Sequence, residues 1–192
     1  MNEQIEKIKK DLKELLSDYR YEHSLRVGET AKELAHIYQI DEEKAYLAGI
    51  IHDIAKEFTK EENIKIMERN GKHLDINSTP RINHALVGAV YAKEKYHLDE
   101  DIIHAISSHA IGDIPMSTLD KIVFIADKIE PGKNYPKIEE ERQLAKKNLD
   151  KAIILCIENN HQKLRKENKK VAPKSIEVLN NLKNNLHENA DQ

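Results

Sequence analysis

Apolar residues recur at helical spacing along most of this chain. In the first stretch, residues 3–17, Ile and Leu occupy positions 5, 8, 12, 15 and 16, which form one face of a helix. Good helix formers dominate the composition, and only 6 Gly and 5 Pro occur among 192 residues. These features predict an all-α fold. With no internal repeat or linker, we expect a single domain over residues 1–192, with its core at about 18–180.

The same periodicity predicts the remaining helices. They are expected over residues 21–39, 42–56, 60–70, 83–95, 99–110, 118–130, 138–160 (extending toward 167) and 174–187. Asp41 is expected to cap the second of these, and Pro173 to begin the last. Asn70-Gly71 is expected to end the helix over 60–70. Residues 71–83 and 131–137 contain turn formers and predict loops, and the tail at 188–192 is expected to fray.

Composition limits the classes of partner. The formal net charge is −3, which gives no strong field toward nucleic acid polymers or anionic membranes. The sole cysteine, Cys156, excludes an internal disulfide, and its setting, AIILCIENN, predicts an ordinary buried thiol. The N-terminus does not resemble a signal peptide, and no window approaches the about 18 apolar residues of a membrane span. We therefore expect a cytoplasmic monomer or homodimer without a membrane or nucleic acid partner.

Residues 48–56, AGIIHDIAK, place a histidine and an aspartate side by side in an apolar stretch. The face of His52 is lined by small residues, which leave room for a bound species or a close helix. Asp53 lies about 100° further round the helix, so one ion is an awkward target for both side chains. A site in which Asp53 bridges two ions, while His52 binds one, is a more natural solution.

Four other predicted helices each turn a ligand-type side chain inward. With the doublet they give six residues: His23, His52, Asp53, His84, His109 and Asp127. Any one of these histidines alone is typical of a hydrogen-bonded core residue. Burying all six together without an ion is costly, so the set predicts a metal site. Imidazole with carboxylate suits iron, manganese or zinc, and cobalt in vitro. The remaining histidines are expected at the surface: His36, His73, His97, His104, His161 and His187.

The order of these residues on successive helices resembles the HD-domain metal-dependent phosphohydrolases. Five segments narrow the resemblance to the YqeK-type family and cover roughly residues 18 to 180. They read YRYEHSLRVGETAKELA, LAGIIHDIAKE, INHALVGAVYAKEKY, AISSHAIG and LDKIVFIADKIEPGKNYP. The resemblance implies an HD-type helical bundle with the metal site in its core. It also implies symmetrical hydrolysis of diadenosine tetraphosphate to two ADP.

The resemblance further implies two metal ions, usually described as iron, held by the same six residues. Asp53 would bridge the pair of divalent or mixed-valence ions. The chain departs from the family at three positions expected near substrate. Ala110 stands where threonine is frequent, Lys133 where arginine is frequent, and Ala172 where a histidine precedes the proline. A lysine can neutralise phosphate but cannot form the bidentate fork of arginine.

These residues suggest a two-metal hydrolysis as a hypothesis. Two ions can lower the pKa of a bridging water, so that a hydroxide attacks a phosphorus of the polyphosphate. Asp53 and Lys56 are the candidate catalytic residues, with Lys56 supporting Asp53 or offsetting phosphate charge. The candidate substrate-binding residues are the ligands His23, Asp53, His109 and Asp127, together with Arg26, Ala110, Lys133, Lys174 and Ser175. Lys174 and Ser175 lie at a predicted helix start, where free N–H groups favour anions.

Three alternatives remain open from the sequence. The first alternative is another HD-type nucleotide hydrolase, such as a nucleoside monophosphate phosphatase or a cyclic nucleotide phosphodiesterase. The chain reads HDIAK rather than HDxGK and has no GYP, which disfavours the cyclic dinucleotide enzymes. A non-enzymatic di-iron protein is the second, but such sites draw on glutamates, and none is among the six. A metal-free structural module is the third, and it would need another partner for every inward group.

Overall fold

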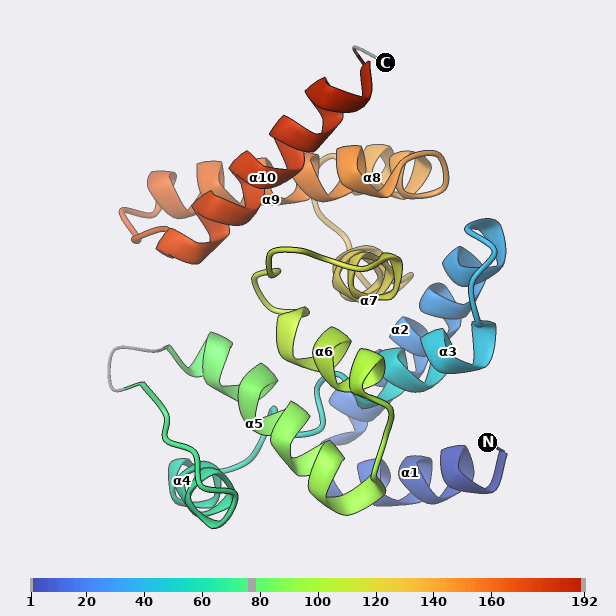
Figure 1. The fold of residues 1–192 in the computed structure, drawn as a ribbon, viewed down its shortest axis with the longest axis vertical. Coiled ribbons are helices and arrows are strands. Elements are labelled where there is room, and N and C mark those ends of the chain that lie inside the picture. The colour runs from blue at the N-terminus through green and yellow to red at the C-terminus, as the bar shows by residue number, and fades with distance from the viewer. Residues whose placement is uncertain (1, 76–78, 191–192) are drawn as a thin grey trace.

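The computed structural model describes residues 2–75 and 79–190, which form ten α-helices and no strand (Figure 1). The predicted all-α fold is confirmed. The helices are α1 (Asn2–Leu15), α2 (Asp18–Ile37), α3 (Glu42–Ile51), α4 (Lys60–Arg69), α5 (Pro80–Tyr96), α6 (Glu100–Ser108), α7 (Thr118–Ile129), α8 (Ile138–Ala145), α9 (Leu149–Lys166) and α10 (Pro173–Ala190). Among these described helices, none has both the length and the hydropathy needed to cross a bilayer.

Helix α7 lies between two groups of helices (Figure 1). Helices α1 to α6 lie on one side of it, and α8, α9 and α10 lie together on the other. A continuous apolar core joins the two groups through α7, whose Ile122, Val123 and Ile125 are fully buried. This arrangement places one end of α7 beside α2, α3 and α6, where the polar residues of the predicted site converge.

Helices α2 and α3 approach each other through their glycines. A Cβ built on Gly49 would lie 2.7 Å from the Cα of Gly28, a backbone atom that cannot give way cheaply. Only glycine therefore fits at position 49 without moving a helix. The close approach brings the first half of α2, which carries His23, against the end of α3, which precedes the histidine–aspartate doublet.

Most expected helix boundaries agree with the structure, and their caps explain them. The Asp41 side chain accepts a hydrogen bond from the Lys44 backbone N–H at 2.9 Å and caps α3. Helix α4 ends at Arg69 before Gly71, whose φ is +66°. Pro173 begins α10 as expected. The last helix continues to Ala190, so residues 188–190 are helical, contrary to expectation, and the rest of the predicted frayed tail lies outside the described residues.

Three expected boundaries are wrong. Helix α3 ends at Ile51, and residues 52–57 form turns whose backbone bonds span three residues, as from the Lys56 N–H to the Asp53 carbonyl. Helix α5 begins at Pro80, so the expected loop at 71–83 is too long, and residues 76–78 lie outside the described residues. The single helix expected over 138–160 is two helices, because the Asn148 side chain caps α9 by accepting from the Lys151 N–H at 2.9 Å.

Candidate metal centre

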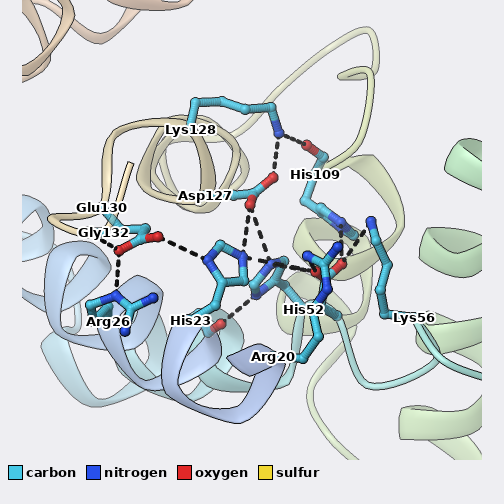
Figure 2. Close-up of polar contacts among 12 residues, drawn as sticks. Arg20, His23, Arg26, His52, Lys56, His109, Asp127, Lys128, Glu130 and Gly132 are labelled. Carbon is cyan, nitrogen blue, oxygen red and sulfur yellow. Dashed lines mark hydrogen bonds and ion pairs between the residues drawn. The ribbon is translucent and has the colours of Figure 1, made fainter. Parts of the chain in front are cut away.

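The structure brings all six predicted metal-ligand residues into one buried cluster, of which Figure 2 labels four. Helix α2 supplies His23, α5 supplies His84 and α7 supplies Asp127. The other three residues lie just beyond helix ends, with His52 and Asp53 after α3 and His109 after α6. The four histidines and Asp53 are each at most 4% exposed, whereas the Asp127 side chain is 16% exposed.

Asp53 divides its two carboxylate oxygens between two sets of imidazoles. Its Oδ1 lies 3.0 Å from His84 Nε2 and 3.4 Å from His109 Nε2. Its Oδ2 lies 3.8 Å from His23 Nε2 and 3.6 Å from His52 Nε2. The Asp127 carboxylate then faces the second set, with Oδ1 at 3.1 Å from His23 Nε2 and 3.6 Å from His52 Nε2. Two adjacent ligand sets thus share Asp53.

The opposite ring nitrogen of each histidine is held by the protein. The Nδ1–H of His52 donates to the Gly49 carbonyl at 2.6 Å, and that of His109 donates to the Ile106 carbonyl at 2.6 Å. The Pro80 carbonyl accepts from the Nδ1–H of His84 at 3.2 Å, and the Glu130 carboxylate accepts from the Nδ1–H of His23 at 3.1 Å.

Carbonyls and carboxylates only accept hydrogen bonds, so all four Nδ1 atoms must carry the proton. A neutral ring with its proton on Nδ1 presents the lone pair of Nε2 to the cluster, and this is the tautomer that binds a metal. Two of the four Nε2 atoms, on His84 and His109, face each other at 3.0 Å. Two lone pairs at that distance repel, and the Lys56 ammonium, 3.1 Å from His84 Nε2, offsets this repulsion as a bound metal cation would.

The buried atoms of the cluster fit a cation in a second respect. His23 Nε2, His52 Nε2 and Asp53 Oδ1 have no hydrogen-bond partner among the described residues. Burial alone would raise the pKa of Asp53, but the imidazoles of His52, His109 and His84 hold it well below its usual value. Burial lowers the pKa of His109 to about 4. The cluster therefore offers ionised carboxylates and, at His109, a neutral imidazole, which is the donor set of a transition-metal site.

Three cationic side chains surround the cluster (Figure 2). Lys56 Nζ lies 3.4 Å from Asp53 Oδ1 and 3.1 Å from His84 Nε2, and burial lowers its pKa. On another side of Asp53, Arg20 Nη1 lies 3.5 Å from Oδ2. Lys128 pairs with Asp127 Oδ2 and donates to the His109 carbonyl at 3.2 Å. The sequence prediction includes Lys56 but neither Arg20 nor Lys128.

Glu130, which no sequence pattern indicated, connects the cluster to Arg26. Its Oε1 accepts from His23 Nδ1–H, and its Oε2 accepts from Arg26 Nε–H at 2.6 Å. The backbone N–H of Gly132 donates to the same Oε2. Arg26, expected to contact phosphate, thus has its Nε bound to Glu130.

The position of Arg20 could have been predicted from the sequence, because it precedes His23 by three residues and so lies on the same helical face. Lys128 is adjacent to Asp127 in the sequence, and adjacency alone does not predict a shared face.

A cavity of about 900 Å³ adjoins the cluster. Its walls come from the start of α5, the residues after α6, α7, the loop at 133–137, α9, and the turn into α10. Three predicted substrate-binding residues line it, namely Ala110, Lys133 and Ser175. Lys174 does not line it, and its ammonium pairs with Asp113 at 2.8 Å instead.

One histidine expected at the surface is buried. His161 is 4% exposed, and its Nε2 lies 2.8 Å from the Ser175 hydroxyl, because α10 covers this side of α9. His104 is 43% exposed and lies 2.9 Å from the buried carboxylate of Asp120. His36, His73 and His97 are exposed as expected, and the side chain of His187 lies outside the described residues. The buried state of Cys156 is confirmed, at 8% exposed.

Comparison with known proteins identifies this arrangement. The family model described as "HD domain" matches residues 20–132, a span that contains all six residues of the cluster. The chain belongs to the HD-domain family. Within this family, it is 38% identical to a protein of Halalkalibacterium halodurans named "Bis(5'-nucleosyl)-tetraphosphatase, symmetrical". That match covers 87% of this chain and 90% of the relative.

Two further matches extend over most of this HD-domain protein. A Bacillus subtilis protein with the same name is 38% identical, covering 88% of this chain and 92% of the relative. The solved structure of a Clostridium acetobutylicum protein, described as a predicted HD superfamily hydrolase involved in NAD metabolism, has a TM-score of 0.87. It is 36% identical and covers 94% of this chain and 97% of that one. The chain is thus a hydrolase of the HD-domain group that contains the symmetrical bis(5'-nucleosyl)-tetraphosphatases.

Proposed function

We propose that this protein hydrolyses diadenosine tetraphosphate symmetrically to two ADP, using two transition-metal ions held by the cluster. Iron is the first candidate, and the donor set also accepts manganese, cobalt or zinc. The names of the relatives support the substrate. The observation that carries the proposal is the convergence of four Nε2 atoms, each with its Nδ1 bound to a protein acceptor, around two carboxylates.

The cluster divides into two candidate ligand sets. His23, His52 and Asp127 would hold one ion, His84 and His109 would hold the other, and Asp53 would contribute one oxygen to each. When bound, the two ions supply a water of lowered pKa and positive charge for the phosphate oxygens. The Nδ1 hydrogen bonds keep all four rings oriented for this role.

The cationic side chains around the cluster would bind and orient the tetraphosphate. Lys56 and Arg20 lie beside Asp53, and Lys128 lies beside Asp127, so positive charge flanks both carboxylates. Phosphate oxygens gain negative charge as the bond to the leaving ADP breaks, and fixed cations at that position stabilise it. Lys56, whose side chain is 26% exposed, and Asp53 remain our candidate catalytic residues. Arg26 would act through Glu130 rather than on phosphate directly.

Product analysis tests the proposal. The protein, purified without chelator and supplied with Fe²⁺ or Mn²⁺, is incubated with diadenosine tetraphosphate, and nucleotides are separated by anion-exchange chromatography. We expect ADP as the only nucleotide product, and loss of turnover in EDTA that excess metal restores. Formation of ATP with AMP would contradict symmetrical attack. Phosphate release from nucleoside monophosphates, without turnover of the tetraphosphate, would point to another HD-type phosphohydrolase.

A further inference from the structure

The turn that follows α7 decides where the Glu130 carboxylate lies. Helix α7 ends at Ile129, and Glu130 leaves the helical conformation with φ −50° and ψ 152°. Its side chain is 2% exposed and accepts the Nδ1–H of His23 at 3.1 Å (Figure 2). The orientation of the His23 ring therefore depends on a residue outside any helix, in a turn that other groups must hold in place.

Arg142 of α8 holds this turn through its backbone carbonyls. Its Nε–H donates to the carbonyl of Ile129 at 2.9 Å. Its Nη2 donates to the carbonyls of Glu130 at 3.0 Å and of Lys133 at 3.1 Å. One guanidinium thus joins three carbonyls, two at the start of the turn and one at its end.

These carbonyls need donors because α7 ends among them. The last carbonyls of a helix have no donor within the helix, and they carry a partial negative charge. The guanidinium of Arg142 supplies several N–H donors in one plane together with a positive charge. Its ion pair within the described part of the chain is with Glu139, at 3.6 Å, and that side chain is 69% exposed, so the pair contributes little. The main contacts of Arg142 are therefore with the turn.

The turn and the Glu130 carboxylate are coupled on their other side by Arg26. Glu130 Oε2 accepts from the Arg26 Nε–H and from the backbone N–H of Gly132 (Figure 2). A Cβ built on Gly132 would lie 2.7 Å from Arg26 Nε, so the backbone of the turn packs directly on this side chain. A shift of the turn would therefore move the carboxylate that orients His23.

Arg142 makes no hydrogen bond or ion pair with the six ligand residues in the part of the chain that the structure describes. It also lies outside residues 20–132, which match the HD-domain model. We propose that Arg142 is a positioning residue for the metal centre. By fixing the turn at 129–133, it holds Glu130 against Nδ1 of His23 and keeps the Nε2 lone pair of that ring directed at the cluster.

The effect of Arg142 is specific to one histidine. The Nδ1–H groups of His52, His84 and His109 donate to backbone carbonyls of α3, α5 and α6, which Arg142 does not touch. Loss of Arg142 should therefore disturb the ligand set that contains His23 and leave the set of His84 and His109 intact. In its consequence for metal binding, this inference rests on the proposed function.

The tautomer of His23 in the metal-free protein gives the first test. Long-range ¹H–¹⁵N correlation spectra of ¹⁵N-labelled protein at alkaline pH show which ring nitrogen of each histidine carries the proton. In Arg142→Gln, whose shorter amide cannot join three carbonyls, we expect His23 to lose its single Nδ1–H form, while His52 and His109 keep theirs. If this variant does not fold, Arg142→Lys keeps the charge but not the planar fork, and should change His23 in the same direction.

Binding of Mn²⁺, followed by isothermal titration calorimetry, gives the second test. We expect one of the two ions to bind about 10–100-fold more weakly in Arg142→Gln, as is typical when a ligand histidine loses its hydrogen-bond partner, and the other to bind as in the wild type. Arg69→Gln is the matched control, because Arg69 on α4 also makes two hydrogen bonds, both to Glu94, far from the cluster in the sequence. It should keep the His23 tautomer and both affinities.

Two outcomes would overturn the inference. An unchanged His23 tautomer in Arg142→Gln would mean that the turn does not need the guanidinium. A similar change in His23, His52 and His109 would mean that Arg142 supports the whole fold rather than one ligand. The spectra need neither metal nor turnover, so a wild-type protein that bound no Mn²⁺ would contradict only the proposed function.

Discussion

The cluster of six histidine and aspartate side chains and the adjoining cavity are built from different kinds of residue. The cluster uses side chains that are almost fully buried, such as His52 at 0% and His109 at 1% exposed, and two of the helices that position it, α2 and α3, touch through their backbones. The cavity uses exposed lysines on α9 and on loops, several of them without an acidic partner among the described residues. A metal ion needs ligands at fixed distances, whereas an ammonium group acts on phosphate over a wider range.

This contrast implies different responses to mutation. A change in the cluster should reduce catalysis and metal content together, because each side chain depends on its neighbours for charge and orientation. A change at one cavity lysine should weaken substrate binding and leave the metal in place. Substitutions of single residues test whether this division holds.

Asp53→Asn should abolish most of the activity. The amide has the shape of the carboxylate but no negative charge. It therefore cannot supply an anionic oxygen to each of the two proposed ions, beside His84 on one side and His52 on the other. We expect kcat/KM for diadenosine tetraphosphate to fall on the order of a thousandfold or more. Metal per chain, measured by inductively coupled plasma mass spectrometry after gel filtration, should fall with it. Asp101→Asn, at an exposed aspartate of α6, is the control and should retain both. A fully active Asp53→Asn protein would exclude this site.

Glu130→Gln should weaken metal binding without unfolding the protein. Glu130 accepts hydrogen bonds from His23 and Arg26, and the amide keeps its size but supplies only one acceptor oxygen. His23 would lose its fixed tautomer, and second-sphere changes of this kind typically cost about 10–100-fold in metal affinity or activity. Competition with a chromogenic chelator measures the affinity. Glu140→Gln, on an exposed face of α8, should match the wild type. An unchanged affinity in Glu130→Gln would show that Glu130 has only a structural role.

Gly49→Ala should destabilise the fold that holds the cluster. The added Cβ would lie 2.7 Å from the Cα of Gly28, so α2 and α3 would have to separate. Overpacking of this kind costs about 1–3 kcal/mol in the free energy of unfolding, which urea denaturation followed by circular dichroism can measure. Gly88→Ala is the matched control in α5, where the nearest heavy atom would lie at 3.5 Å. If both variants were equally stable, the close approach of the two helices would not be required.

The sequence predicted the cluster better than the cavity, for a physical reason. Helical facing brought His23, His84 and His109 inward because each shares a stripe with apolar neighbours, and that pattern is local. The predicted end of α3 is wrong because residues 52–57, which include His52 and Asp53, form turns whose backbone hydrogen bonds span three residues. The apolar periodicity does not distinguish such turns from an α-helix.

Tertiary packing decided what the sequence left out. His161 looked exposed because α9 alone does not reveal that α10 covers it. The cavity joins residues from helices α5, α7, α8, α9 and α10 and from the segments at 110–111, 133–137 and 167–172, so no local pattern indicates it. Glu130 and Arg26 likewise meet across 104 residues of chain. The apolar pattern that a residue shares with its own helix carries no information about such long-range contacts.

His104 offers the smallest expected effect, and it tests a contact outside both regions. Burial lowers the pKa of His104, but the carboxylates of Asp120 and Asp113 outweigh burial and raise it above its usual value. The protonated imidazole therefore stabilises the fold. This contribution is complete below the unfolded-state pKa of about 6.5 and is lost as pH rises through the higher folded-state pKa.

We therefore expect His104→Gln to destabilise the protein more at pH 6 than at pH 9. Because the side chain is 43% exposed, the difference should be at most about 1 kcal/mol. Urea denaturation at the two pH values measures it, and the exposed His73→Gln should show no such difference. An equal effect of His104→Gln at both pH values would mean that the ion pair with Asp120 contributes nothing to stability. The α6–α7 connection, which leads from His109 toward Asp127, would then depend on its other contacts, such as the Lys174–Asp113 ion pair and the hydrogen bond from Lys128 to the His109 carbonyl.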